Sequence, residues 1–286
     1  MYKQLSYIIV GIILLVACSK EQDTPIISHI VVEGWIEDEG FPIVILTTSL
    51  PISYDNQNIN NLDDHLIRWA KISISDGNDS VMLVGKYTHD YFPPYIYTTG
   101  RMRGKAGYIY TLTVDYQNYH ATAVTTIPHR PTVDSFSVEK CLDSDTLYQI
   151  STYITDNPNE KNYYQIFTRV GTHTKQYNAA YLGSIDDETI RGSFKIPIYR
   201  GNMIMNKDYT PYFLIDDTVS IKVAQVDETS FRFWDDYSKS LSLSGNLFLA
   251  TSQNVCSNII GGMGYWCGYG ATTLYIPISD HIKQNR

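Results

Sequence analysis

A cysteine near the amino terminus lies where lipid attachment could occur. Cys18 follows Leu15, Val16 and Ala17, the aliphatic and small residues that precede the cysteine of a lipobox. The apolar run at 5–17 is shorter than the ~20 residues of a membrane-spanning helix and suits a signal peptide. We therefore predict a lipoprotein signal peptide at residues 1–17 and lipidation at Cys18, where each buried methylene would contribute about 0.8 kcal/mol to anchoring. A plain secretory signal and an uncleaved anchor are the alternatives.

The residues that follow Cys18 form a short polar segment. Residues 18–25 include Lys20, Glu21, Gln22 and Asp23, so we predict a lipidated tether there. The segment resembles the acidic export signal that sends lipoproteins to the outside of the outer membrane in Bacteroidota-type bacteria, although Lys20 and Gln22 interrupt it. We expect a lipid-anchored outer-membrane protein exposed at the cell surface; a merely solvated tether is the alternative.

Three cysteines remain if Cys18 carries lipid, namely Cys141, Cys256 and Cys267. Cys256 and Cys267 lie close in sequence, so in an oxidising compartment they could form a disulfide worth about 2–3 kcal/mol. Two free buried thiols are the alternative. No Cys-x-x-Cys pair or Cys/His cluster indicates zinc. We predict no metal site and no cofactor.

The sequence lacks the common catalytic motifs. It contains no Gly-x-Ser-x-Gly and no His-Glu-x-x-His. Adjacent acids such as Asp186 and Asp187 would face opposite sides of a strand, so they do not form a catalytic pair. The net charge of −8, without a basic patch, argues against nucleic acid. We predict that the chain is not an enzyme and has no catalytic residues; a hydrolase built from distant acids is the alternative.

Aromatic side chains are the best candidates for ligand or partner contact. The chain has 24 Tyr, and two aromatic clusters lie near prolines or glycines, where rings could form rigid contact surfaces. The candidate contact residues are Tyr91, Phe92, Tyr95, Tyr97, Tyr265 and Trp266. The alternative is that these rings pack on their own domain.

Alternating apolar and polar residues predict a mainly β protein. Many short alternating segments separated by turn residues are typical of β-sandwiches. We predict two sandwich domains of Ig-like or transthyretin-like type, at residues 26–130 and 131–286, with the boundary at Pro128 and Pro131. The second domain should carry one short helix near 228–241, because its aromatic residues are spaced for one helix face. Asp227 is the expected N-cap.

A glycine-rich segment at 261–270 precedes the last predicted strand. It lacks the strand–loop–helix order of a phosphate-binding loop. We expect its glycines to allow close backbone approach or bulges instead.

Several segments, taken in order, resemble one known family. The segments are residues 31–36, Gly104, 108–114, 121–128, Asp156 with Pro158, 162–164, 227–234 and 258–270. Together they resemble Bacteroidota outer-membrane lipoproteins with the domain of unknown function DUF4249, over nearly the whole mature chain. Cys256, Cys267 and the stretch around Cys141 depart from what we expect of the family.

The resemblance implies a transport-related role without supplying catalytic residues. Members of the family are usually encoded beside SusC-like TonB-dependent transporters. The expected function is therefore that of a non-catalytic binding or accessory partner of such a transporter, comparable in role to SusD-like proteins. The alternative is a stand-alone surface adhesin or a glycan- or peptide-binding lipoprotein. The ligand is not predicted.

Overall fold

The computed structural model describes residues 29–49, 65–157, 159–189, 192–201, 209–244 and 255–284. The predicted signal peptide, the tether and the lipidation site Cys18 lie outside these residues. Within the described ranges, none of the helices has the length and apolar character needed to cross a membrane.

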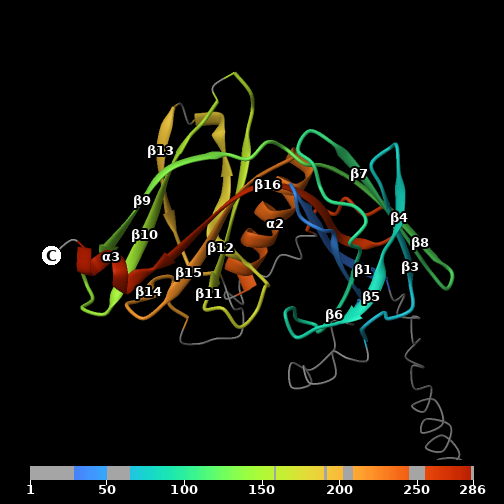
Figure 1. Ribbon diagram of the computed structural model, residues 1–286, viewed down its shortest axis with the longest axis horizontal. Coiled ribbons are helices and arrows are strands. Elements are labelled where there is room, and N and C mark those ends of the chain that lie inside the picture. Colours follow the sequence, from blue (N-terminus) through green and yellow to red (C-terminus); the bar gives the residue numbers. More distant parts are fainter. Residues whose placement is uncertain are drawn as a thin grey trace, which may run out of the picture.

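Strands from both ends of the chain build the largest sheet, which has eight strands (Figure 1). In order across the sheet they are β12 (Asn178–Asp186), β11 (Tyr163–Val170), β15 (Thr218–Val226), β16 (Met263–Pro277), β1 (Ile30–Glu37), β2 (Ile43–Thr48), β6 (Tyr95–Thr98) and β5 (Val84–Tyr87). The late strand β16 runs parallel to β1 and antiparallel to β15. It therefore joins the amino-terminal and carboxyl-terminal halves of the sheet.

Two four-stranded sheets pack on the large sheet. The strands of the first are β4 (Ser80–Met82), β3 (Lys71–Ser75), β7 (Ile109–Tyr116) and β8 (Tyr119–Thr126). The strands of the second are β13 (Ser193–Ile198), β10 (Leu147–Thr155), β14 (Phe213–Leu214) and β9 (Thr132–Lys140). Each small sheet covers one half of the large sheet, so the protein has two sandwich-like halves.

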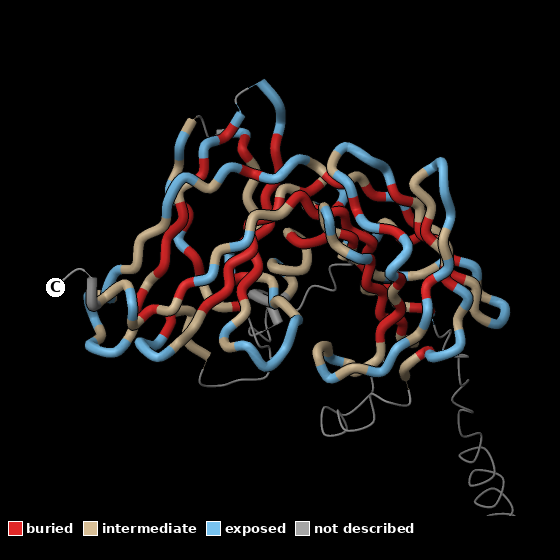
Figure 2. Tube along the Cα trace, in the orientation of Figure 1, coloured by how far each residue is buried: buried red, intermediate tan, exposed pale blue. Residues whose placement is uncertain are grey.

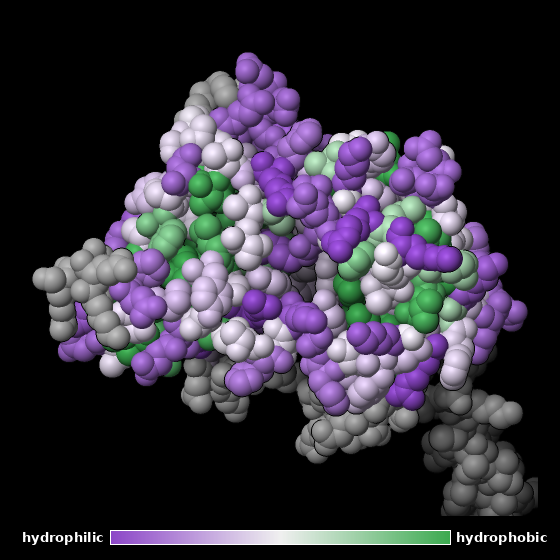
Figure 3. Space-filling view, viewed as in Figure 1, coloured by the Kyte–Doolittle hydropathy of each residue, from purple (hydrophilic) through white to green (hydrophobic). Residues whose placement is uncertain are grey.

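Each half has its own apolar core between the sheets. The first core includes Ile36, Ile72 and Trp266, and the second includes Ile150 and Ile221, all 0 % exposed. Buried residues follow the inner strands of both halves (Figure 2), and on the face seen in Figure 3 hydrophilic residues separate the apolar areas of the two halves. The mainly β, sandwich-type fold is confirmed. The boundary between residues 130 and 131 stays a prediction, since the large sheet extends through both halves.

The predicted helix is α2 (Glu228–Ser244), and Asp227 is its N-cap. The Ser230 amide donates to Asp227 Oδ1 at 2.8 Å, while the Thr125 hydroxyl donates to Oδ2 at 2.8 Å. The cap therefore fixes the start of the helix and ties it to β8. The aromatic face of α2 packs against the large sheet, and Trp234 is buried there.

The chain also contains a helix that the sequence did not lead us to predict. The short α3 (Ile278–Gln284) follows β16 directly, and Ile278 and Ile282 pack on the second core. The Ile278 amide donates to the Asp217 carbonyl at 3.1 Å, which holds the start of α3 beside the turn before β15.

The glycine-rich segment allows β16 to approach β8 and the residues after it, as predicted. A Cβ added to Gly268 would lie 2.5 Å from the Thr126 carbonyl oxygen. At Gly270 it would lie 2.2 Å from the Pro128 carbonyl oxygen. The backbones are thus in direct contact at positions where no side chain fits.

Candidate functional site

A cleft of about 710 Å³ lies on the large sheet, on the face opposite the two small sheets and beside α2. Strand β1 shows how the sequence creates it. Val32 and Ile36 are fully buried in the first core, whereas Glu33, Trp35 and Glu37 are half-buried on the opposite face and line the cleft. The period of two along the strand therefore separates a core face from a polar, aromatic site face.

Aromatic side chains form much of the cleft wall. The rings come from three elements, β1, α2 and β16, and from two loops, and belong to both halves of the chain: Trp35, Tyr91, Tyr177, Trp234, Tyr237, Tyr265 and Tyr269. The Trp35 and Tyr91 ring centroids are 5.9 Å apart, and those of Trp234 and Tyr265 are 5.0 Å apart. Such packed rings give a ligand a rigid contact surface at low entropic cost.

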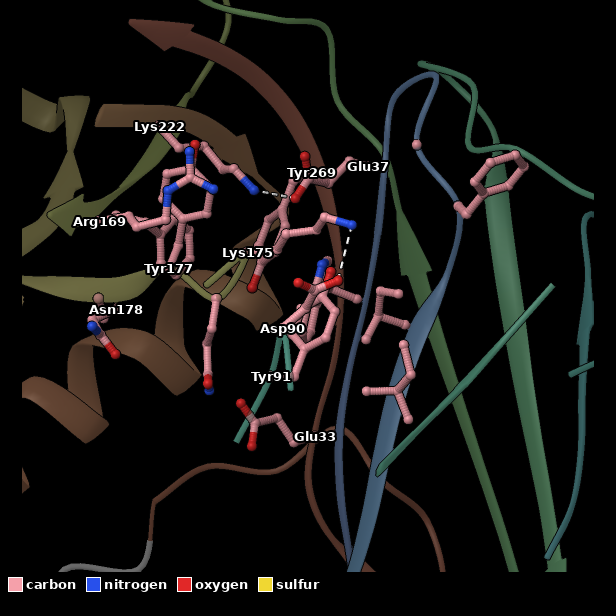
Figure 4. A pocket seen from close by; sticks show the side chains of 18 of the residues that line it. Glu33, Glu37, Asp90, Tyr91, Arg169, Lys175, Tyr177, Asn178, Lys222 and Tyr269 are labelled. Carbon is pink, nitrogen blue, oxygen red and sulfur yellow. Dashed lines mark hydrogen bonds and ion pairs between the residues drawn. The ribbon is translucent and has the colours of Figure 1, made fainter. Parts of the chain in front are cut away.

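Two loops, one from each half of the chain, meet at the cleft. The amides of Lys175 and Gln176 donate to the Asp90 carbonyl at 2.9 and 3.2 Å. The Phe92 amide donates to Gln176 Oε1 at 2.8 Å, and Lys175 forms a 2.9 Å ion pair with Asp90. These contacts hold the Tyr91 ring in the cleft wall (Figure 4).

Basic side chains gather around Tyr177 at one end of the cleft (Figure 4). Lys222 Nζ lies 4.3 Å from the Tyr177 ring centroid, and Arg169 Cζ lies 4.8 Å from it. Lys222 is also paired with Glu37. The two terminal nitrogens of Arg169 donate to the Thr174 carbonyl at 3.2 Å and to Ser220 Oγ at 3.0 Å.

Glu33 lies apart from these basic groups, below Tyr91 in Figure 4. The Tyr265 hydroxyl donates to Glu33 Oε1 at 2.9 Å. Removal of the carboxyl group from bulk water raises the pKa of Glu33, an effect that the Tyr265 hydrogen bond only partly opposes. In turn, burial and the neighbouring Glu33 raise the pKa of Tyr237.

The predicted aromatic contact residues divide between the cleft, the surface and the core. Tyr91 and Tyr265 line the cleft, while Phe92 is 60 % exposed outside it. Tyr97 and Trp266 are not contact residues, because they are 2 % and 0 % exposed in the first core. Tyr95 is half-buried, and its hydroxyl donates to the Arg68 carbonyl at 2.9 Å. The rings of Tyr95, Tyr97 and Trp266 therefore pack on their own domain, which was the alternative to a contact role.

The expected Cys256–Cys267 disulfide is not present in the structure, where both thiols are free. Cys267 is buried in the aromatic cluster under α2, and this burial raises its pKa to about 12. Cys256 is exposed, and its amide donates to Asp236 at 3.1 Å. The two side chains occupy different environments, so sequence proximity was a poor guide to pairing. Cys141 is free as well.

The charged residues of the cleft were missed by the sequence analysis. Glu33 and Lys222 lie in segments that we read as strands without a role in a site, and Glu37 lies in a segment that we read as a turn but that belongs to β1. The available signal was the placement of two carboxylates and Trp35 at alternate positions of an otherwise apolar strand. Arg169, at the end of β11, gave no comparable signal.

The site does not resemble a metal centre. Among the described residues, no group of three or more His, Cys, Asp or Glu side chains could hold a metal ion.

No curated protein matches the sequence. Residues 20–274 match the family model described as "Domain of unknown function (DUF4249)". Because this match spans most of the 286 residues, the chain belongs to the DUF4249 family.

Proposed function

We propose that this protein is a non-catalytic ligand-binding lipoprotein that works with a SusC-like TonB-dependent transporter in the outer membrane of a Bacteroidota-type bacterium. The observation that carries the binding role is the cleft, whose volume of about 710 Å³ falls within the ~300–1,000 Å³ typical of ligand sites. Its aromatic walls are typical of such sites, and the charged side chains among its lining residues could orient a ligand.

The lipobox supports the membrane part of this proposal. Lipid on Cys18 would anchor the chain, and the polar residues 18–25 would tether the folded part to the membrane surface. A cleft held near a transporter would raise the local concentration of the ligand that the transporter carries. The transporter itself rests on the family resemblance, which is an argument by analogy.

The transporter partnership predicts a stable complex in native membranes. We expect the full-length protein, solubilised in mild detergent and purified by an affinity tag, to bring a TonB-dependent barrel with it in a stoichiometric amount. Mass spectrometry of the purified material is the measurement, and a Cys18→Ser variant is the control for anchoring. Recovery of a lipidated monomer without a barrel would contradict the partnership.

Filling the cleft should prevent ligand capture without unfolding the protein. Ala179 is half-buried on β12 and lines the cleft beside Phe167, so Ala179→Trp should place an indole in the ligand space. We expect at least a ~10-fold loss of the ligand that native mass spectrometry detects on the wild-type protein, which corresponds to about 1.4 kcal/mol.

The matched control for this variant is Tyr181→Trp on the same strand. Tyr181 is 38 % exposed and does not line the cleft. Circular dichroism should show the same fold for both variants. Equal ligand retention by the wild type and Ala179→Trp would show that the cleft is not the binding site.

A stand-alone adhesin or a glycan- or peptide-binding lipoprotein is the second candidate. Exposed aromatic side chains favour it, since Trp69 is 89 % exposed and Phe92 is 60 % exposed. Rings of this kind can form contacts with a glycan or a protein outside the cleft. Binding that survives Ala179→Trp and is lost in Trp69→Ala would favour this candidate.

A further inference from the structure

The charged groups of the cleft are mostly paired with one another. Lys222 pairs with Glu37, and Lys175 pairs with Asp90. Three other charged residues line the cleft. Glu33 and Arg169 form no ion pair among the described residues, and Lys86 is exposed on β5. Among the half-buried groups of the cleft wall, one carboxyl group and one guanidinium group therefore have no ion-pair partner within the described structure, while the Lys86 ammonium group lies exposed to water.

The guanidinium of Arg169 has unused hydrogen-bond donors. It carries five N–H groups, and its two hydrogen bonds go to neutral acceptors, the Thr174 carbonyl and Ser220 Oγ. Its Nε is buried and makes no hydrogen bond within the described structure. A ligand carboxylate could accept from the free N–H groups of the terminal nitrogens and would supply the missing negative charge.

Glu33 offers the complementary environment for a cation. Tyr265 on β16 donates a hydrogen bond to it, and Tyr237 on α2 is close enough for their charges to interact. Trp35 lies two residues further along the same face of β1. A carboxyl group among aromatic rings is suited to an ammonium group, which ring faces attract and a carboxylate neutralises.

We propose that the cleft binds a short peptide with free ends, its ammonium group at Glu33 and its carboxylate at Arg169. This inference rests on the proposed binding function and names the ligand class for it. Strands β16 and β15 separate β1 from β11, which gives a lateral separation of three inter-strand steps, or roughly 14 Å. The two residues are also offset along the strands, because Glu33 pairs with Tyr265 of β16 whereas Arg169, through Ser220, is level with Tyr275. An extended chain of about four residues covers the lateral separation alone, so a ligand that reaches both residues must be longer than four residues.

The test measures the affinity of alanine peptides of two to ten residues by titration calorimetry. Each length is used with free ends, with an acetylated amino end and with an amidated carboxyl end. We expect free-ended peptides of more than four residues to bind best, and each blocked end to weaken their binding by at least ~10-fold. Equal binding of free and blocked peptides would overturn the proposal.

Two variants assign the ends of the peptide to the two residues. Glu33→Gln should lose the preference for a free amino end while keeping the preference for a free carboxyl end. Arg169→Gln should show the reverse pattern. A general loss of structure would not produce these opposite changes. The control is Lys195→Gln, at an exposed residue of β13 outside the cleft, which should keep both preferences.

Proton release provides a second readout. At a pH below the raised pKa of Glu33, an ammonium group that binds beside it should favour the ionised carboxylate, so binding of the free peptide should release a proton. The calorimetric heat at acidic pH should therefore differ between two buffers of different ionisation enthalpy, such as acetate and MES, for the wild type, and the difference should be smaller in Glu33→Gln. The same proton uptake or release in both proteins would contradict the assignment of Glu33.

The outcomes distinguish the ligand class from the binding function. If no peptide binds but native mass spectrometry finds another molecule that Ala179→Trp excludes, the peptide proposal fails and the binding function stands. If no peptide binds and no molecule is excluded by Ala179→Trp, both fail.

Discussion

Replacing Gly268 by alanine is expected to lower the free energy of unfolding by about 3 kcal/mol, at the upper end of the usual cost of overpacking. The added Cβ would lie 2.5 Å from the Thr126 carbonyl oxygen and 2.9 Å from the Ile127 nitrogen. Both are backbone atoms, so no side chain can move aside. Strand β16 would have to separate from β8 and the residue that follows it.

The same position is connected to the helix that borders the cleft. The Gly268 amide donates to Thr125 Oγ1 at 2.7 Å, and that hydroxyl donates to the N-cap carboxylate of Asp227. Displacing β16 would therefore disturb the start of α2 together with the sheet. Chemical denaturation of the wild type and the variant measures the loss, and a fall in Tm of roughly 6–12 °C should accompany it.

Gly100→Ala is the matched control. Gly100 has no atom within 4 Å of its added Cβ, and its backbone does not adopt a positive φ. Its replacement should change stability by no more than about 0.5 kcal/mol. A Gly268→Ala variant as stable as Gly100→Ala would show that the contact between β16 and β8 can open at little cost.

Local patterns predicted the elements of the fold. The residues 26–36 predicted a strand, which the structure has as β1 (Ile30–Glu37), and the spacing of Phe231, Trp234 and Tyr237 predicted α2 with Asp227 at its start. These features depend on neighbours a few residues apart, which is the information that a pattern contains. The number of short predicted strands indicated a sandwich. The many glycines between residues 261 and 270 indicated that two backbones approach each other closely there.

The cleft could not be predicted, because it is made by contacts between distant parts of the chain. Glu33 and Tyr265 are 232 residues apart in sequence, and Lys222 and Glu37 are 185 apart. They meet because β16 inserts between β1 and β15, a parallel pairing with β1 that no local pattern reveals. Tyr97 and Trp266 were assigned to a contact surface for the same reason, since composition does not show which face of a strand is covered.

The last expected result concerns Glu33, whose pKa is raised by its removal from water. Below the unfolded-state pKa, near 4.5, Glu33 is protonated in both states. Between that value and the higher folded-state pKa, the folded protein binds more protons than the unfolded chain, so stability falls as pH rises. The slope of this loss is at most about 1.4 kcal/mol per pH unit.

Glu33→Gln should therefore be more stable than the wild type at pH 7, and the difference should shrink as the pH falls toward 4.5. The amide oxygen of glutamine can still accept the hydrogen bond from Tyr265, so the variant removes the titration and keeps the contact. Unfolding in urea at several pH values is the measurement.

Glu139→Gln provides a control of opposite sign. The ion pair with Lys195 lowers the pKa of Glu139, so this carboxylate contributes stability above its unfolded-state pKa and loses it as the pH falls. Its replacement should slightly destabilise the protein at pH 7. If Glu33→Gln also destabilised the protein at pH 7, the ionised carboxylate of Glu33 would be stabilised within the empty cleft. Glu33 would then have no need of a ligand cation, and a neutral ligand would fit that end of the cleft better than an ammonium group.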